Sequence, residues 1–526
     1  MNPIRTLICR RQFLLATGAA SAGALTTRTA IAAGKAATAA CSNGAKPATT
    51  IKGVVVEKPV YKELSLEELL AGFGVTAGPG GAAGSPPGAA AGALPGAPAG
   101  AAFGAPSNAT PGVYVDNGKY LPDNSRAGVV SAGKVGDAFA SGVKIDTKDA
   151  QVGGVYVKGL GTEYILADAD IVLEGDGGGL GGANCGAAAD DYARLTIRNC
   201  TITTSGKSKN ATSVQNHGVL KVYNSTLKAN GAPFTPDLTS TDQKKQLEID
   251  GNSRTHITLS NSYSYFYYST IIAEGWAALS TDGSEGFVYL EANHCKVQTI
   301  KSGYGTYADW MCHNFINCCD FDVAAMTAIL AGQADIAFRD TKAKCGSYFA
   351  LIHCVGAAAQ VSTLKVTGGE IACKDAAVLV KSANAEILFE GAKVSSENGI
   401  LLKSVKSVDP NAAKAANTKG QKVYGIHATF KDMDVTGDID HSLDKENRSM
   451  TVYLESTTLK GAIKDASIKM DQFSKWVATT DSNVTIVGNV DVSQIDAPAG
   501  VTITAVAAVG GKYALASCGT LVLKTA

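Results

Sequence analysis

One short pattern recurs along most of the chain: two apolar residues separated by one residue, followed two positions later by a turn residue such as Asn, Asp or Gly. Residues 195–199 (LTIRN) and 220–224 (LKVYN) are clear copies. Alternation with period two indicates strands, whereas a helical repeat needs a period of 3.6. The expected turn residues are Asp168, Asn199, Asn224, Asn261, Ala292, Cys318, Asp340, Gly368, Gly391, Asp432, Ser456 and Gly488.

The spacing of these copies constrains the fold most. The eleven intervals between Asp168 and Gly488 average about 29 residues, and several are close to 24. A second apolar run precedes the pattern in most copies. A strand repeat of this length predicts a solenoid, in which each strand lies about 4.8 Å from its equivalent in the next turn.

The repeat resembles the right-handed parallel β-helix proteins of the pectin-lyase-like superfamily over roughly residues 150–520. This resemblance implies an all-β fold, a single-stranded right-handed parallel β-helix of about 12 turns that follows a disordered leader. We expect the β-helix domain to span residues 113–526. The polygalacturonase motifs and the Trp-Ile-Asp-His signature of pectate lyases are absent, so no catalytic residue is carried over from either family.

The N-terminal region predicts export. Arg10 and Arg11 precede an apolar run over residues 13–25 and a small-residue cleavage site at 30–32, which predicts a signal peptide over residues 1–32. The sequence RRQFL at 10–14 resembles the twin-arginine motif, with a general secretory signal as the alternative. Residues 33–112 are expected to form a leader with a Gly/Ala/Pro-rich linker. The predicted location is therefore the periplasm or the extracellular space.

Composition excludes several classes of function. The 47 Lys and Arg residues balance the 47 Asp and Glu residues, which argues against nucleic-acid binding. No stretch reaches 18 apolar residues, so we expect no membrane span. The 12 Cys residues form no CxxC pair and the seven His residues no HxxH or HExxH motif, which argues against a zinc site. The cysteines are expected to be mostly buried thiols, with one or two disulfides as the alternative.

A column of polar residues is expected on the outer face of the solenoid. In seven successive turns the second apolar run ends in a polar residue. If the turns stack in this register, acidic side chains gather at one end of the column and basic ones at the other. A slip of one residue would move a side chain to the opposite face of its strand. The expected column is Asp250, Asp282, Asp309, Gln333, His353, Lys381 and Lys403.

Aromatic residues are concentrated in the loops beside the acidic end of this column. Sugar rings stack on aromatic faces while their hydroxyls bond to acids, so residues 250–310 are expected to form an aromatic-walled groove for a carbohydrate or similar polar substrate. Asp282, Asp309, His353 and Tyr307 are the candidate catalytic residues. The candidate substrate-binding residues are Asp250, Arg254, Tyr265, Tyr267, Trp276, Tyr304, Trp310 and Lys381.

Several chemistries fit these residues. Asp282 and Asp309 on adjacent turns would lie about 5 Å apart, which would raise one pKa and supply the acid and the base or nucleophile for glycosidic cleavage. Alternatively, the three stacked carboxylates could bind Ca²⁺ against a uronate, while His353, Lys381, Tyr307 or Arg254 removes an α-proton. We therefore predict an exported lyase, hydrolase or epimerase, with a non-enzymatic adhesin, surface or binding protein as the alternative. Polar residues that merely end strands at solvent would also give this pattern.

Overall fold

The computed structural model describes residues 49–58, 109–179, 181–231, 247–283, 286–354, 360–407 and 424–526. The chain divides into a unit Met1–Pro47 and a unit Ala48–Ala526, and all described residues belong to the second. The predicted signal peptide and residues 33–48 and 59–108 of the predicted leader lie outside the described residues.

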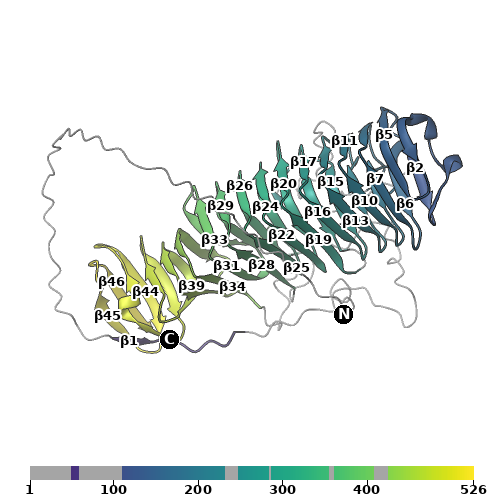
Figure 1. Ribbon diagram of the computed structural model, residues 1–526. Coiled ribbons are helices and arrows are strands. Elements are labelled where there is room, and N and C mark those ends of the chain that lie inside the picture. The colour runs from purple at the N-terminus through teal and green to yellow at the C-terminus, as the bar shows by residue number, and fades with distance from the viewer. Residues whose placement is uncertain are drawn as a thin grey trace, which may run out of the picture. The chain divides into compact units, whose positions relative to one another are not determined.

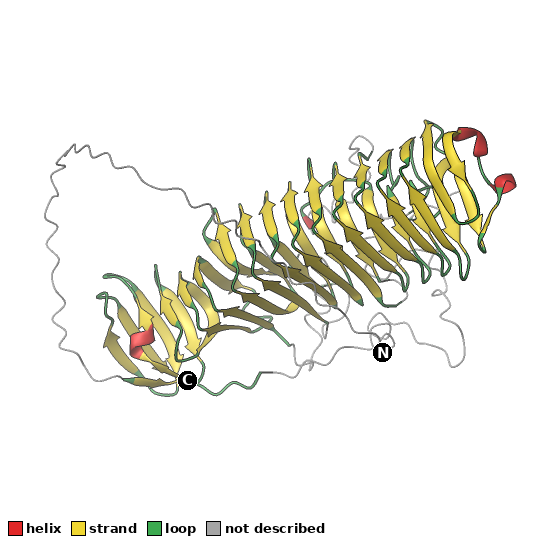
Figure 2. Cartoon of the chain, in the orientation of Figure 1, coloured by secondary structure: helices red, strands yellow, loops and turns green. Residues whose placement is uncertain are grey.

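The described chain is all-β, as the sequence predicts. Almost every element is a strand, and 40 strands join in one long, mostly parallel sheet (Figures 1 and 2). Through the middle of the stack each strand pairs with the third strand before it and the third after it. Each turn therefore contributes three strands, where the sequence pattern had indicated two. This arrangement is compatible with a parallel β-helix.

The strands fall into three parallel ladders. The first ladder contains β7 (Glu163–Ala167), β10 (Arg194–Arg198), β13 (Val219–Tyr223), β16 (Tyr263–Tyr267), β19 (Val288–Asn293), β22 (Cys312–Asn317), β25 (Ala334–Arg339), β28 (Val361–Thr367), β31 (Asn384–Glu390), β34 (Ile426–Lys431) and β37 (Met450–Glu455). The second contains β8 (Asp170–Glu174), β11 (Thr201–Ser205), β14 (Thr226–Ala229), β17 (Thr270–Ala273), β20 (Lys296–Thr299), β23 (Asp320–Val323), β26 (Lys342–Cys345), β29 (Glu370–Cys373) and β32 (Lys393–Ser396).

The third ladder carries the predicted polar column. It contains β6 (Val152–Lys158), β9 (Ala187–Ala189), β12 (Thr212–Val214), β15 (Arg254–Leu259), β18 (Ala277–Asp282), β21 (Tyr304–Ala308), β24 (Met326–Ala331), β27 (Ala350–His353), β30 (Val378–Lys381), β33 (Ile400–Val405) and β36 (Asp438–Leu443). At the start of the stack β2 (Thr110–Asp116) pairs with β6. At the other end β39 (Ile463–Met470), β41 (Ser482–Ile486), β44 (Thr502–Ala507) and β46 (Thr520–Thr525) continue the main sheet.

The predicted turn residues mostly occupy one corner of the coil. Nine of the twelve lie directly after a strand of the first ladder, Gly488 lies after β41, and all ten have positive φ. Asn and Asp tolerate this left-handed conformation better than most residues, which explains why they mark the corner. Two predicted positions are wrong: Asn261 lies between β15 and β16, and Ala292 lies within β19. The corner residues of these two turns are instead Tyr268, after β16, and His294, after β19. Outward tyrosines on β16 obscured the alternation there.

The interior of the coil is continuous and apolar. Inward residues such as Val222, Phe266 and Leu290 are completely buried. Burying a side chain of this size stabilises the folded state by roughly 1.5–3 kcal/mol. Eight free cysteines are also buried, as expected for thiols that fill a core. Cys318, by contrast, is disulfide-bonded.

Part of the expected leader is ordered. β1 (Thr50–Lys52) pairs antiparallel with β42 (Asn489–Asp491) near the C-terminal end of the stack, and Ile51 is buried there. Nearby, Lys58 forms an ion pair of 2.8 Å with Glu386. The expectation of a disordered leader is therefore wrong for residues 49–58, because one buried side chain and a strand edge are enough to fix a three-residue strand. Among the described residues, no helix has the length and apolar character needed to span a membrane.

Candidate functional site

The third ladder brings four of the seven predicted column residues into one register. β18 and β21 pair Ser280 with Tyr307, and the same register places Asp309, just after β21, beside Asp282. Two turns further on, His353 pairs with Lys381. Ala331 occupies the position between Asp309 and His353.

The other three residues are outside this column. Leu259, not Asp250, pairs with Asp282. The main chain of Asp250 instead accepts a hydrogen bond from the Trp276 amide, at the start of β18 rather than its end. Gln333 lies two positions beyond Ala331, and Lys403 pairs with Leu379 while Val405 pairs with Lys381. These expectations failed because the inserted segments change the length between corner and strand, which shifts the register by a few residues.

Asp282 and Asp309 lie on adjacent turns, and the environment of Asp309 changes its acidity. Burial raises the pKa of Asp309 well above its ordinary value, and the charge of Asp282 raises it further. The Gly283 amide donates a hydrogen bond of 2.6 Å to Asp309 Oδ1, and the Cys312 thiol donates one of 3.2 Å to the same atom. Within the described residues, Asp282 Oδ1 is buried and has no hydrogen-bond partner. The pair therefore offers a carboxyl group that holds its proton to a higher pH than an ordinary aspartate, beside an acceptor oxygen without a donor.

Aromatic and basic groups extend from this pair toward the start of the strands. The hydroxyls of Ser280 and Tyr304 lie 2.9 Å apart on the same outer face. The guanidinium carbon of Arg254 lies 5.7 Å from the ring centroid of Trp276. Arg254 Nε and Trp276 Nε1 are both buried, and among the residues that the structure describes neither has a hydrogen-bond partner. A substrate polar group could satisfy these two donors, since buried donors without partners are uncommon.

Tyr307 completes the group around the carboxyl pair. Burial raises its pKa well above the ordinary value, and the negative charges of Asp309 and Asp282 add to that effect. The phenol therefore stays protonated at neutral pH. It can donate a hydrogen bond through its O–H and accept a hydrogen bond through its oxygen lone pairs.

His353 and Lys381 lie beyond the carboxyl pair in the same column. Both ring nitrogens of His353 are buried, and neither has a hydrogen-bond partner in the described part of the chain. Burial, together with the charge of Lys381, lowers the pKa of His353 to about 4, so the ring is neutral at pH 7. Lys381 Nζ forms an ion pair of 2.5 Å with Glu248 Oε1. Residues 247–250 therefore cross the outer face of this ladder.

The outer face of the third ladder is partly covered, although Arg254, Asp282 and Tyr307 remain partly exposed. Leu247 and Ile249 pack with residues of successive strands in a second apolar cluster outside the coil. The remaining members of this cluster are Trp276, Ala277, Tyr304, Ala325, Met326, Ile329, Leu351 and Leu379. The polar groups of the column are thus held in a low-dielectric environment, where electrostatic interactions are strong.

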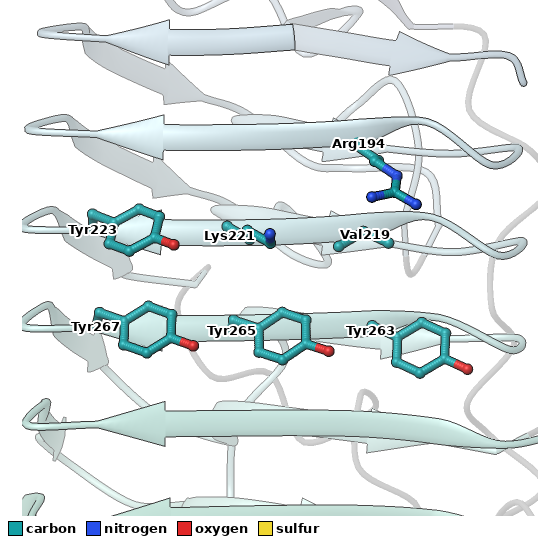
Figure 3. Close-up of a pocket in the computed structure, with 7 residues that line it drawn as sticks. All are labelled: Arg194, Val219, Lys221, Tyr223, Tyr263, Tyr265 and Tyr267. Carbon is teal, nitrogen blue, oxygen red and sulfur yellow. The ribbon is translucent and has the colours of Figure 1, made fainter. Parts of the chain in front are cut away.

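The predicted aromatic groove is divided between two ladders. Tyr265 and Tyr267 lie on β16 in the first ladder and are separated from the carboxyl pair by the corner of the coil. They line an open cavity of about 470 Å³ with side chains of β10 and β13 (Figure 3). Trp310 is buried at the corner directly after Asp309. One continuous groove over residues 250–310 is therefore not formed by the described residues.

The proposed calcium site depended on three stacked carboxylates, and only Asp282 and Asp309 share the column. Among the residues that the structure describes, no group of three or more His, Cys, Asp and Glu side chains is arranged to bind a metal ion. Sequence reasoning also missed Gly283 and Cys312, which bond to Asp309. The signal was the short segment 309–312, where a tight turn brings Cys312 back to Asp309, and the Cys312 amide donates a hydrogen bond of 3.1 Å to the Asp309 carbonyl.

Comparison with known proteins gives no relative: no protein-family model, no curated protein and no solved structure matches this chain.

Proposed function

We propose that this protein is an enzyme that acts on a carbohydrate or similar polyhydroxylated substrate by general acid–base catalysis at Asp282 and Asp309. The observation that carries the proposal is the pairing of a buried Asp309, whose pKa is raised well above its ordinary value, with an Asp282 oxygen that has no hydrogen-bond partner among the described residues. Two carboxyl groups with separated pKa values are the usual means of cleaving a glycosidic bond.

Each residue has a defined role in this proposal. Asp309 donates its proton to the leaving oxygen, and Asp282 either attacks the anomeric carbon as the nucleophile or removes a proton from the water that attacks it. Arg254 and Trp276 direct their unpartnered N–H groups toward substrate oxygens. Tyr307 donates a hydrogen bond, and neutral His353 is an additional proton acceptor beyond the pair.

The fold and the location complete the proposal. We infer a right-handed coil of about 12 turns of the pectin-lyase-like kind, since crossovers between parallel strands are almost always right-handed. We also propose that residues 1–32 direct export to the periplasm or beyond through the twin-arginine route.

The test is turnover of a panel of polysaccharides, with mass spectrometry to detect shortened or unsaturated products. Asp309→Asn and Asp282→Asn are each expected to lower the rate at least about 100-fold, because one proton-transfer group is lost. Asp322→Asn, on β23 of the adjacent ladder, is the matched control and should retain the wild-type rate. The proposal fails if the wild-type protein converts no member of the panel, or if either carboxyl variant keeps its activity.

The pH profile gives a second test. The general acid must be protonated, so activity should fall as the pH rises through the raised pKa of Asp309. In Asp282→Asn the charge that raises this pKa is lost, so the residual activity should decline at a lower pH than in the wild type. An unchanged alkaline limb would contradict the assignment of Asp309 as the acid.

A further inference from the structure

The outer face of the first ladder carries a row of tyrosines. Tyr263, Tyr265 and Tyr267 project from alternate positions of β16, and Figure 3 shows their rings side by side with the hydroxyls pointing the same way. Tyr223 of β13 stacks on Tyr267, with ring centroids 5.0 Å apart and planes at 11°. The four rings border the open cavity of about 470 Å³.

The aromatic surface continues onto the next two turns. Tyr289 of β19 lies 5.6 Å from Tyr265, and Phe315 of β22 lies 5.5 Å from Tyr289, both measured between ring centroids. Tyr263 is 37% exposed and Phe315 is 40% exposed. A contiguous exposed aromatic surface of this kind is uncommon on a soluble protein and marks a binding site.

Positive charge borders the row on one side. In the ladder register Lys221 pairs with Tyr265, and Arg194 pairs with Val219, the neighbour of Tyr263. Both cations are exposed, and within the described chain neither has an ion-pair or side-chain hydrogen-bond partner. Two acids lie nearby: Glu163 is the register partner of Arg194, and Glu291, the register partner of Tyr265 on the next turn, accepts hydrogen bonds of 2.8 and 2.7 Å from Tyr289 and Asn293. A third cation is close to the row, since the guanidinium carbon of Arg198 lies 5.5 Å from the Tyr223 ring centroid. Positive charge therefore predominates on the side of the row formed by β10 and β13, whereas Glu291 lies on the side of β19.

We propose that this surface, formed by Tyr223, Tyr263, Tyr265 and Tyr267 with Arg194 and Lys221, binds an acidic glycan chain. The faces of successive sugar rings stack on the tyrosines, which lie about 6–7 Å apart along the strand. Carboxylate or sulfate groups of the chain meet the two cations, an interaction that salt weakens. The surface belongs to a different ladder from the carboxyl pair, so the inference does not depend on the proposed catalytic function.

The test is direct binding of the full-length protein to acidic glycans (polygalacturonate, alginate and chondroitin sulfate) and to neutral ones (dextran and mannan). The wild type should bind at least one acidic glycan, more weakly at higher salt, and bind the neutral glycans at least about tenfold more weakly. Tyr265→Ala should weaken acidic-glycan binding by about tenfold or more, whereas Tyr265→Phe keeps the stacking face and most of the affinity. Lys221→Ala should weaken binding and flatten its salt dependence. Ile165→Ala, an exposed side chain of β7 on the same ladder, is the matched control and should bind normally.

The outcomes separate the two proposals. Asp309→Asn should bind glycan like the wild type, so loss of turnover with retained binding leaves the surface assignment intact. Failure to bind any acidic glycan, equal binding of neutral glycans, or unaltered binding by a folded Tyr265→Ala protein overturns it. Concentration-dependent self-association that Tyr265→Ala abolishes would assign the surface to a second copy of the chain and would also overturn the glycan proposal.

Discussion

The buried imidazole of His256 should make the stability of the stack depend on pH. His256 lies on β15 with Nδ1 2.9 Å from Thr212 Oγ1 and Nε2 2.8 Å from Thr258 Oγ1. Burial lowers its pKa from 6.5 to about 3. Between these values the unfolded chain binds a proton that the folded chain does not, so stability falls as the pH falls.

The magnitude follows from the two pKa values. At pH 4 the unfolded imidazole is protonated and the folded one is still largely neutral. This pH lies about 2.5 units below the unfolded pKa of 6.5, and these units set the size of the effect. At 1.36 kcal/mol per unit, His256 costs the folded state about 3 kcal/mol at pH 4 compared with pH 7. His256→Gln retains hydrogen-bonding groups but has no ionisable ring, so this part of the pH dependence should disappear.

Urea unfolding at pH 7 and pH 4 measures the effect. His256→Gln should have a lower free energy of unfolding than the wild type at pH 7. Between pH 7 and pH 4 the difference in unfolding free energy between the two proteins should shift by about 3 kcal/mol in favour of the variant. Because solenoids can unfold in parts, amide hydrogen exchange of β15 and its neighbours should report the same shift. Phe266→Leu removes the ring that contacts His256 at 4.7 Å and should destabilise equally at both pH values. A gap between wild type and His256→Gln that is independent of pH would refute the reasoning.

Three further predictions follow from the geometry. Lys381→Met removes a charge that lowers the pKa of His353, so the His353 pKa measured by NMR titration should rise above about 4. An unchanged His353 pKa would contradict the pairing of His353 with Lys381. Burial raises the pKa of Cys185 to about 11, so a maleimide should label it only in denaturant, and labelling of the native protein contradicts its burial. Gly206→Ala should lower the unfolding midpoint, since φ is +139° and a Cβ would lie 2.2 Å from a carbonyl oxygen. Gly391→Asn, at φ +61° in open space, should stay within about 0.5 kcal/mol of the wild type, and equal effects of the two changes would contradict this account.

Much of the candidate site could be anticipated from strand ends. Asp282, Asp309, His353 and Lys381 each end an apolar run, and parallel pairing with a constant register brings such positions together. The prediction that Asp250 belongs to the column was wrong, because residues 247–250 precede β15 instead of belonging to it. The sequence pattern counts residues along the chain, whereas the column depends on which residues the hydrogen-bond ladder pairs.

The sequence by itself determined the all-β class, the repeat and most of the corner positions, because alternation and the left-handed preference of Asn, Asp and Gly are local properties of the backbone. Tertiary structure alone decided that each turn has three strands, which separates Tyr265 on the first ladder from Asp309 at the end of the third. It also decided that the pKa of Asp309 is raised, since desolvation and a neighbouring charge depend on residues that are distant along the chain. The alternation along a strand determines which of its faces is apolar. The orientation of the three ladders relative to one another, and the residues that meet at each corner, are determined only when the turns stack.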